Sequence, residues 1–192
     1  MDAERFFDVG EAAAMGVCGA PSTWPEIPIH IHDHASLPMP LLWEAQARTA
    51  SIFEGIGVRV VWTQKKRASD PDAARAITLK IIAQAPDDVR PGVLAQTTPS
   101  GRSIVVFYDR VRHISGGWQS LAPALLAHVF AHEIGHVLQA VGRHSETGIL
   151  KPHWEYEDFL LMIRRRMAFT PFDASLMRSS IGVGSCGRPV TE

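Results

Sequence analysis

Two histidines one helical turn apart, with a glutamate beside the first, are the strongest chemical signal in this sequence. Residues 132–136 read His-Glu-Ile-Gly-His, and on an α-helix residues four apart lie on one face. The imidazoles of His132 and His136 would converge on one point with Glu133 beside them, a pattern that occurs by chance roughly 0.02 times in a chain of this composition. Neutral imidazoles at about 2.0–2.1 Å suit Zn²⁺, which in a catalytic site keeps one position open for water. The pattern predicts two zinc ligands and a general base.

Other histidines offer weaker metal sites. His128 falls on the same helix face one turn earlier, but one metal does not readily collect ligands from three successive turns, so His128 is interpreted as a core or supporting residue. His30, His32 and His34 alternate along an extended segment and would share one face. A polar strand face that runs into a turn at Asp33 is the simpler interpretation of those three.

The segment around the motif resembles the metzincin clan of zinc endopeptidases. The likeness depends on residues 132–136, a glycine that ends the helix at Gly142, the pair His144-Ser145, and an apolar turn that ends in Pro-His-Trp at 152–154. Upstream, Gly-Val-Leu-Ala at 92–95 resembles the edge strand that holds substrate in that clan. The resemblance covers residues 27–168.

This resemblance implies a zinc metallopeptidase that cleaves peptide bonds with a zinc-activated water. His132, His136 and His144 would hold Zn²⁺, Glu133 would be the general base, and Leu150 would lie in the turn below the metal. The peptide or protein substrate would bind antiparallel to the edge strand, at Val93, Leu94 and Ala95 and on to Thr97. A second donor to the oxyanion is often a tyrosine, but neither Tyr108 nor Tyr156 stands at the clan position, so His153 and Tyr156 are candidates that the resemblance does not assign.

Two positions depart from the clan pattern. The clan places its glycine three residues and its third ligand six residues after the second histidine, whereas Gly142 and His144 follow His136 by six and eight. Leu150 stands where the clan has methionine, an exchange that conserves volume and usually costs under ~1.5 kcal/mol.

Three different interpretations remain open. In the first, a carboxylate about twenty residues after the motif is the third ligand, as in gluzincin-like sites, and Glu155 and Glu157 lie nineteen and twenty-one residues beyond His136. Spacing alone does not exclude these glutamates. His144 is favoured over Glu157 because the residues around it match the clan in several places and the glutamates have an explanation in the dipole of their helix. The second is a zinc-binding protein of this fold without proteolytic activity, and the third is a structural domain whose helix histidines lie in the core.

The elements that must position these residues can be predicted from hydrophobic periodicity. We expect strands at 27–32, 58–62, 76–83 and 103–108, a short edge strand within 92–97, a helix from Pro40 to near Gly55, an active-site helix from Leu121 to at least Leu138, and a last helix over about 154–168. Such an order predicts an α+β fold, with a mixed twisted sheet of about five strands, an antiparallel edge strand and a backing helix. We expect a leader at 1–25, a catalytic lobe at 26–142, and a small, mostly helical C-terminal lobe at 143–192 that contains the third ligand.

Composition excludes several function classes. The formal net charge is −1, so no basic excess favours nucleic acid as a partner, and no apolar run predicts membrane insertion. Cys18 and Cys186 lie near opposite ends, too far apart in sequence for a zinc site made of cysteines, and their spacing does not decide whether they pair. The clan usually works outside the cytoplasm, so the resemblance implies a secreted or periplasmic protein whose signal has been removed, although the residues present leave the cytoplasm open.

Overall fold

A single mixed β-sheet forms the base of the molecule. The structure, a computed structural model, describes residues 24–63, 75–98, 101–139 and 142–181. The strands are β1 (Glu26–Asp33), β2 (Arg59–Thr63), β3 (Ile77–Ile82), β4 (Ala95–Thr97) and β5 (Ser103–Phe107), in the order β2-β1-β3-β5-β4. Neighbouring strands are parallel except β4, which pairs antiparallel with β5 and forms one edge of the sheet.

Alternating side chains account for the strands. In β3, Ile77, Leu79 and Ile81 are fully buried, and the residues between them are more exposed. The register places Ile29 of β1 opposite Ile77 and Ile104 of β5 opposite Leu79. One face of the sheet is therefore a continuous apolar layer.

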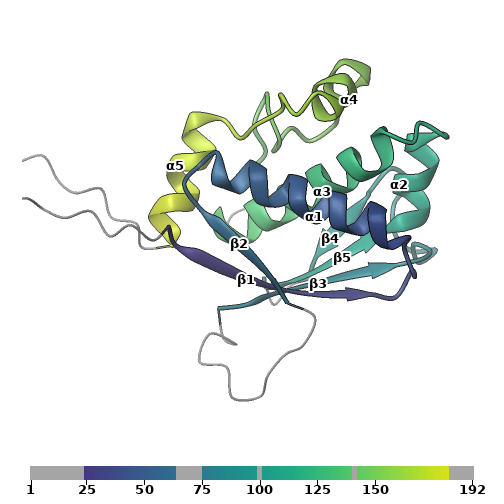
Figure 1. Ribbon diagram of the computed structural model, residues 1–192, viewed down its shortest axis with the longest axis horizontal. Helices are drawn as coiled ribbons and strands as arrows, with labels where there is room; N and C mark the ends of the chain where they lie inside the picture. Colours follow the sequence, from purple (N-terminus) through teal and green to yellow (C-terminus); the bar gives the residue numbers. More distant parts are fainter. Residues whose placement is uncertain (1–23, 64–74, 99–100, 140–141, 182–192) are drawn as a thin grey trace, which may run out of the picture.

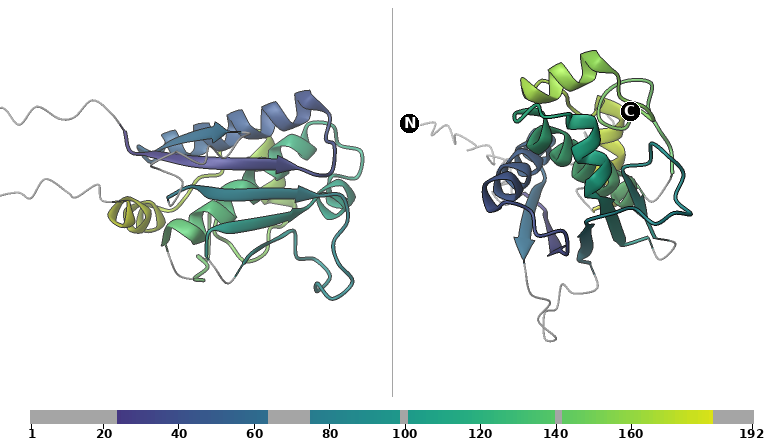
Figure 2. Two further views of the ribbon diagram at one scale, coloured as in Figure 1. Left: turned by 90° about the horizontal axis from the view of Figure 1, so that it is seen from below. Right: turned by 90° about the vertical axis from the view of Figure 1, so that its right-hand side faces the viewer.

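Helices cover that layer from one side, as Figures 1 and 2 show. They are α1 (Met39–Glu54), α2 (Tyr108–Ser115), α3 (Leu121–Gln139), α4 (Tyr156–Ile163) and α5 (Pro171–Ser180). α1 has a proline in its first turn, where the missing N–H costs no intrahelical hydrogen bond. It buries Leu42, Ala45, Thr49 and Phe53 at helical spacing. The α+β fold, with a five-stranded mixed sheet, a backing helix, a helix that carries residues 132–136 and helices near the C-terminus, is confirmed.

Helix α3, which carries His132, Glu133 and His136, crosses the middle of the core. Phe130, Ala131 and Ile134 on α3 are fully buried, and α3 packs along α1 (Figure 1). By length and composition α3 is also the one described helix that could cross a membrane, yet 72% of that window is buried inside the molecule. A buried core helix passes the same test, so its hydrophobicity is explained by packing.

The chain after residue 142 packs onto the same core. Ile149, Leu150, Met162 and Met177 belong to one hydrophobic cluster with residues of the sheet. The proposed division into lobes at 26–142 and 143–192 stays a prediction. The expected leader falls mostly outside the described residues, as do Cys18 and Cys186.

Three expected elements differ in the structure. Residues 103–108 do not form a strand throughout, because α2 begins at Tyr108, and the strand expected within 92–97 forms only at Ala95–Thr97. The last expected helix does not reach 168: it ends at Ile163, and Arg165 adopts a left-handed φ of 55°. The helices α2 and α5 were not predicted.

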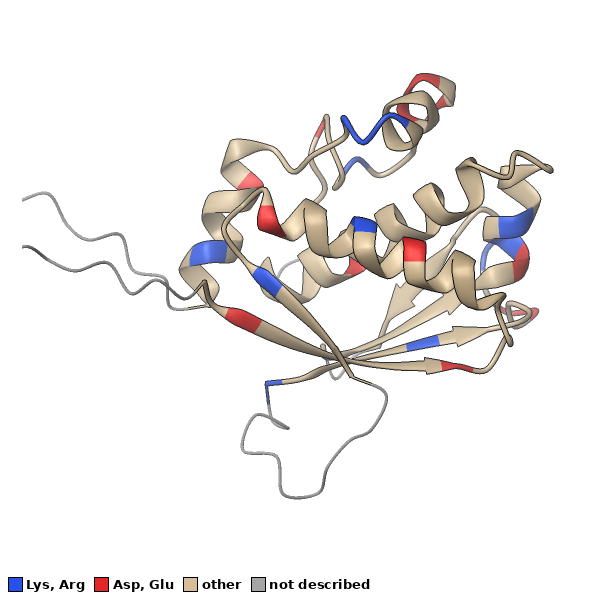
Figure 3. Ribbon diagram, viewed as in Figure 1, with Lys and Arg blue, Asp and Glu red and all other residues tan. Residues whose placement is uncertain are grey.

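Charged residues of both signs are distributed over the elements (Figure 3). Ion pairs join Arg48 to Glu44 on α1 and Arg59 to Glu26 across β2 and β1. The exposed pair of Arg59 and Glu26 contributes at most about 1 kcal/mol.

Candidate metal centre and cleft

Three imidazoles meet beside α3. His132 and His136 lie one turn apart on α3, and His144 approaches from the loop that follows. One potential ligand atom from each lies within 4.8 Å of the other two, and Nε2 of His132 is 3.0 Å from Nε2 of His136. Two ligands of a tetrahedral zinc ion lie about 3.3 Å apart, so the spacing of the pair on α3 fits one ion.

A backbone carbonyl fixes the orientation of His132. Its Nδ1 lies 2.8 Å from the carbonyl oxygen of Ile149, and because a carbonyl only accepts, Nδ1 donates and Nε2 presents its lone pair to the centre. Burial, with the nearby His136 as the next cause, lowers the pKa of His132 to about 4. The ring is therefore neutral at pH 7, as a metal ligand must be.

Glu133 points toward the edge strand. Its Oε2 accepts a hydrogen bond of 2.9 Å from the hydroxyl of Thr97 on β4. Burial raises the pKa of the Glu133 carboxyl, and the Thr97 hydrogen bond acts in the opposite direction. A carboxylate whose proton affinity is raised in this way is better suited to accept and return a proton.

A tight turn lies under the imidazoles. The backbone N–H of Ser145 donates to the carbonyl of Leu150 at 2.8 Å, which closes the loop 145–150. Gly148 has a φ of +77°, and a Cβ there would lie 2.6 Å from the carbonyl oxygen of Ala168. Leu150 is fully buried, and its Cδ2 lies 3.1 Å from where a Cβ on Gly135 would be. Leu150 thus supports α3 between the two histidines.

A cleft of about 1320 Å³ runs between this centre and the edge strand. Its lining includes the three histidines, Glu133, Val93, Leu94, Ala95, Thr97, His153 and Trp154. The ring of Trp154 stands edge-on to that of His132, with centroids 5.5 Å apart.

Only part of the predicted edge segment has free backbone groups on its outer side. The carbonyl of Leu94 and the N–H of Thr98 bond to β5, so by antiparallel alternation the groups of Ala95 and Thr97 face the open edge. The carbonyl of Val93 accepts from Arg110 at 2.6 Å. Ala95 and Thr97 are therefore the residues whose N–H and C=O groups an added strand can reach.

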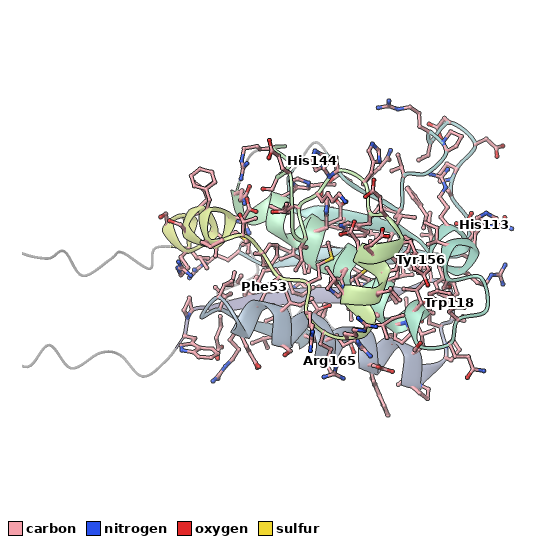
Figure 4. The ribbon with its side chains drawn as sticks, turned by 90° about the horizontal axis from the view of Figure 1, so that it is seen from above. Phe53, His113, Trp118, His144, Tyr156 and Arg165 are labelled. Atoms are coloured by element: carbon pink, nitrogen blue, oxygen red, sulfur yellow. The ribbon has the colours of Figure 1, made fainter. Side chains whose placement is uncertain are left out.

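The remaining ligand and donor candidates lie elsewhere. Glu157 is exposed on α4, and Glu155 caps that helix in a capping box with Asp158. Neither joins the three histidines in the metal-binding group found in the described part of the chain. The ring of Tyr156 packs against Trp118 at 5.9 Å, away from His144 (Figure 4).

Four other histidines, His30, His32, His34 and His128, lie outside the metal-binding group and contact neighbouring residues of the fold. His128 is buried in the core, with Nδ1 2.7 Å from the carbonyl of Ala124, and burial lowers its pKa to about 4. Nδ1 of buried His30 lies 2.6 Å from the Thr63 hydroxyl. The rings of His32 and His34 stack with centroids 6.2 Å apart.

Two groups at the site were not predicted from the sequence. The hydroxyl of Thr97 and the carbonyl of Ile149 contact Glu133 and His132, respectively. The position of Thr97 at the end of an expected edge strand was the one available signal for the first. No local pattern identifies the carbonyl that orients an imidazole seventeen residues away.

A protein of known structure has a similar fold. The structure is similar to the crystal structure of a zinc-dependent peptidase from Methanocorpusculum labreanum, with a TM-score of 0.56 and 14% sequence identity over 78% of this chain and 99% of that chain. No protein-family model and no curated protein sequence matches the chain. At this identity the similarity shows a shared fold.

Proposed function

We propose that this chain is a zinc-dependent endopeptidase of metzincin type. The observation that carries the proposal is the convergence of three imidazoles and Glu133 in a cleft bordered by an open strand edge. The similarity in fold to a zinc-dependent peptidase supports the same activity.

In this proposal His132, His136 and His144 hold Zn²⁺. The bound ion supplies activation of a water molecule and stabilisation of negative charge on the reacting carbonyl. The Ile149 carbonyl keeps the Nε2 lone pair of His132 directed at the ion. Leu150 fills the space below α3 and supplies no ligand.

Glu133 is the general base. Its carboxylate accepts the proton of the attacking water and returns it to the amine that leaves, so that the peptide C–N bond breaks with no net change at the enzyme. The Thr97 hydroxyl holds one carboxyl oxygen and leaves the other for the water.

The substrate binds as an extended strand. Ala95 and Thr97 present backbone donors and acceptors at the free edge of β4, and a peptide that pairs antiparallel with them gains main-chain hydrogen bonds without sequence preference. Strand pairing next to Glu133 places a peptide bond within the catalytic cleft.

Cleavage of a quenched fluorescent peptide library tests the activity. Wild-type protein loaded with zinc should cleave the library, and Glu133→Gln should lose at least about 100-fold in kcat/KM while it keeps its bound zinc. Cleavage that persists in Glu133→Gln would contradict the assignment of the base. A wild type that binds zinc and cleaves no peptide would instead identify a non-proteolytic zinc protein.

Zinc stoichiometry tests the third ligand. We expect one zinc per chain for the wild type and for Glu157→Ala, and a much weaker affinity for His144→Ala. The opposite result, with affinity lost in Glu157→Ala and retained in His144→Ala, would identify a gluzincin-like site. A wild type without zinc, and without a zinc-dependent rise in Tm, would overturn the proposed function.

A further inference from the structure

A buried carboxylate on α5 gathers hydrogen bonds from three segments of the chain. Asp173 is fully buried and accepts from the Gln139 amide at 3.2 Å, the Ser145 hydroxyl at 2.8 and 2.9 Å, and the Thr170 hydroxyl at 2.6 Å. Arg143 forms an ion pair with the same carboxylate. These partners lie at the end of α3, in the following loop, and at the N-cap of α5.

Two of these partners flank His144. Arg143 precedes it and Ser145 follows it, so the backbone of the proposed third ligand is held on both sides by one carboxylate. The guanidinium of Arg143 also lies over the ring of Phe172, 4.9 Å from its centroid. His144 itself is exposed. The loop that carries it is held by two adjacent residues of α5, Phe172 and Asp173.

Gln139 extends the connection to the helix that carries His132 and His136. It lies three residues beyond His136 on α3. The N–H of Ser145 bonds to the carbonyl of Leu150, the residue next to Ile149, whose carbonyl orients His132. Asp173 is thus linked to the surroundings of all three imidazoles.

The chemistry of the partners requires an ionised carboxylate at this position. An amide, a guanidinium and two hydroxyls all donate, and an ionised carboxylate is the side chain that only accepts. An asparagine of the same shape would direct an NH₂ group at these donors and leave Arg143 without its counter-charge.

We propose that Asp173 is a positioning residue for the zinc centre, which holds the 143–145 segment so that His144 meets the two imidazoles of α3. This proposal rests on the zinc site of the proposed function. In this proposal α5 supports the zinc site, although α5 does not line the cleft and does not contain the His-Glu-x-x-His motif.

Zinc affinity, measured by competition with a chromophoric chelator, tests the proposal without any assay of proteolysis. Asp173→Asn should raise the zinc Kd by about tenfold or more, the range typical of residues that orient ligands. Met177→Ala, which removes a fully buried side chain from the same helix, should lower Tm and leave the Kd within about twofold of wild type. An equal rise in Kd for Met177→Ala would show that general destabilisation of α5 is sufficient, and would overturn the proposal.

A double-mutant cycle with His144 isolates the route of the effect. If Asp173 acts through His144, then Asp173→Asn should change the Kd little in a protein that already carries His144→Ala. The same fold-change in both backgrounds, or no change in either, would overturn the proposal. A wild type that binds no zinc would overturn the proposed function first, so the two failures are distinguishable.

Two milder variants at Ser145 test the proposal if Asp173→Asn does not fold. Ser145→Ala removes one donor to Asp173, and Ser145→Thr retains the hydroxyl. We expect a raised zinc Kd for the alanine variant and a Kd near that of wild type for the threonine variant. Equal affinities for the two would contradict the proposed role.

Discussion

At the scale of single residues, the carboxyl of Glu133 is subject to two opposing effects. Burial raises its pKa, while the hydrogen bond from Thr97 favours the ionised form. The edge strand that would bind substrate therefore also contributes to the proton affinity of the proposed base.

Thr97→Val removes this hydroxyl at nearly constant volume. The pKa of Glu133 should rise further, so the acid limb of the kcat/KM profile should move to higher pH, with a loss of about fivefold on that limb, equivalent to about 1 kcal/mol. Profiles of kcat/KM against pH for wild type, Thr97→Val and Thr97→Ser check this. An unchanged limb in Thr97→Val, or an equal shift in Thr97→Ser, would contradict it.

Leu150 offers a second test at this scale. It is fully buried against Gly135, so Leu150→Met keeps an apolar side chain of similar volume and should cost less than about 1.5 kcal/mol. We expect zinc affinity and kcat/KM to stay within about threefold of wild type, because the side chain packs without ligating. A large change in zinc affinity with unchanged Tm would mean that this position does more than pack.

At the scale of elements, the 145–150 turn connects the third imidazole to the orientation of the first. Its geometry depends on Gly148, which combines a left-handed backbone with close approach to the Ala168 carbonyl.

Gly148→Ala should destabilise the protein by at least about 1–2 kcal/mol, because an L side chain is strained at this φ and would contact the carbonyl. Thermal unfolding should show a Tm several degrees lower, at roughly 2–4 °C per kcal/mol. Gly57→Ala is a matched control, since Gly57 also has a positive φ but an added Cβ meets nothing within 4 Å. A smaller Tm loss for Gly148→Ala than for Gly57→Ala would refute the role of the Ala168 contact.

The elements that could be predicted are those specified by local patterns. The alternation of Ile27, Ile29 and Ile31 predicts β1, and the helical spacing after Pro40 predicts α1. The start of α2 at Tyr108 depends on distant contacts, such as the Asp109 carboxylate that accepts from the N–H of Ala85. No local periodicity contains that information.

The bounds of the two C-terminal helices, α4 and α5, were also not predicted correctly from local patterns. The three consecutive arginines at 164–166 suit the C-terminal end of the dipole of a helix that runs to 168, yet α4 ends at Ile163 without a glycine to mark the stop. For α5, a start signal was present in Thr170, Pro171 and Asp173, since Thr170 caps the helix by accepting from the N–H of Asp173.

The residues of the candidate site also divide into those that a local pattern specifies and those that distant contacts position. His132, Glu133 and His136 could be predicted because one helical turn brings them together. His144 could be named only through the resemblance, since its position depends on hydrogen bonds to a residue twenty-nine positions later.

At the scale of the whole molecule, the same carboxylate ties stability to pH. Burial alone would raise the pKa of Asp173, but the hydrogen bonds from Thr170, Ser145 and Gln139, together with the charge of Arg143, lower it below the ordinary value of 3.8. Because the folded-state pKa is the lower one, the stability that this group contributes is present above about pH 4 and is lost as the pH falls through the folded-state value.

We therefore expect the unfolding free energy of the metal-free protein to decline in acid, and the decline to be shallower in Asp173→Asn. At pH 7 that variant should be less stable by about 1–3 kcal/mol, the usual cost of leaving buried hydrogen-bond donors without an acceptor, because the Arg143 side chain is 40% exposed and can regain water. Chemical denaturation between about pH 2 and pH 7, with Glu157→Gln as a control on the exposed face of α4, measures both effects. Parallel pH dependences for wild type and Asp173→Asn would exclude Asp173 as their source.

The anchoring of the third imidazole by α5 also has a consequence during biosynthesis. Chains are made from the N-terminus at about 5–20 residues per second, so the two helix imidazoles and Glu133 leave the ribosome before Asp173 does. Until α5 has emerged and docked, a nascent chain lacks the support that holds His144 in place. A metal site assembled in this order would acquire its full affinity only after residues 171–180 have emerged and folded.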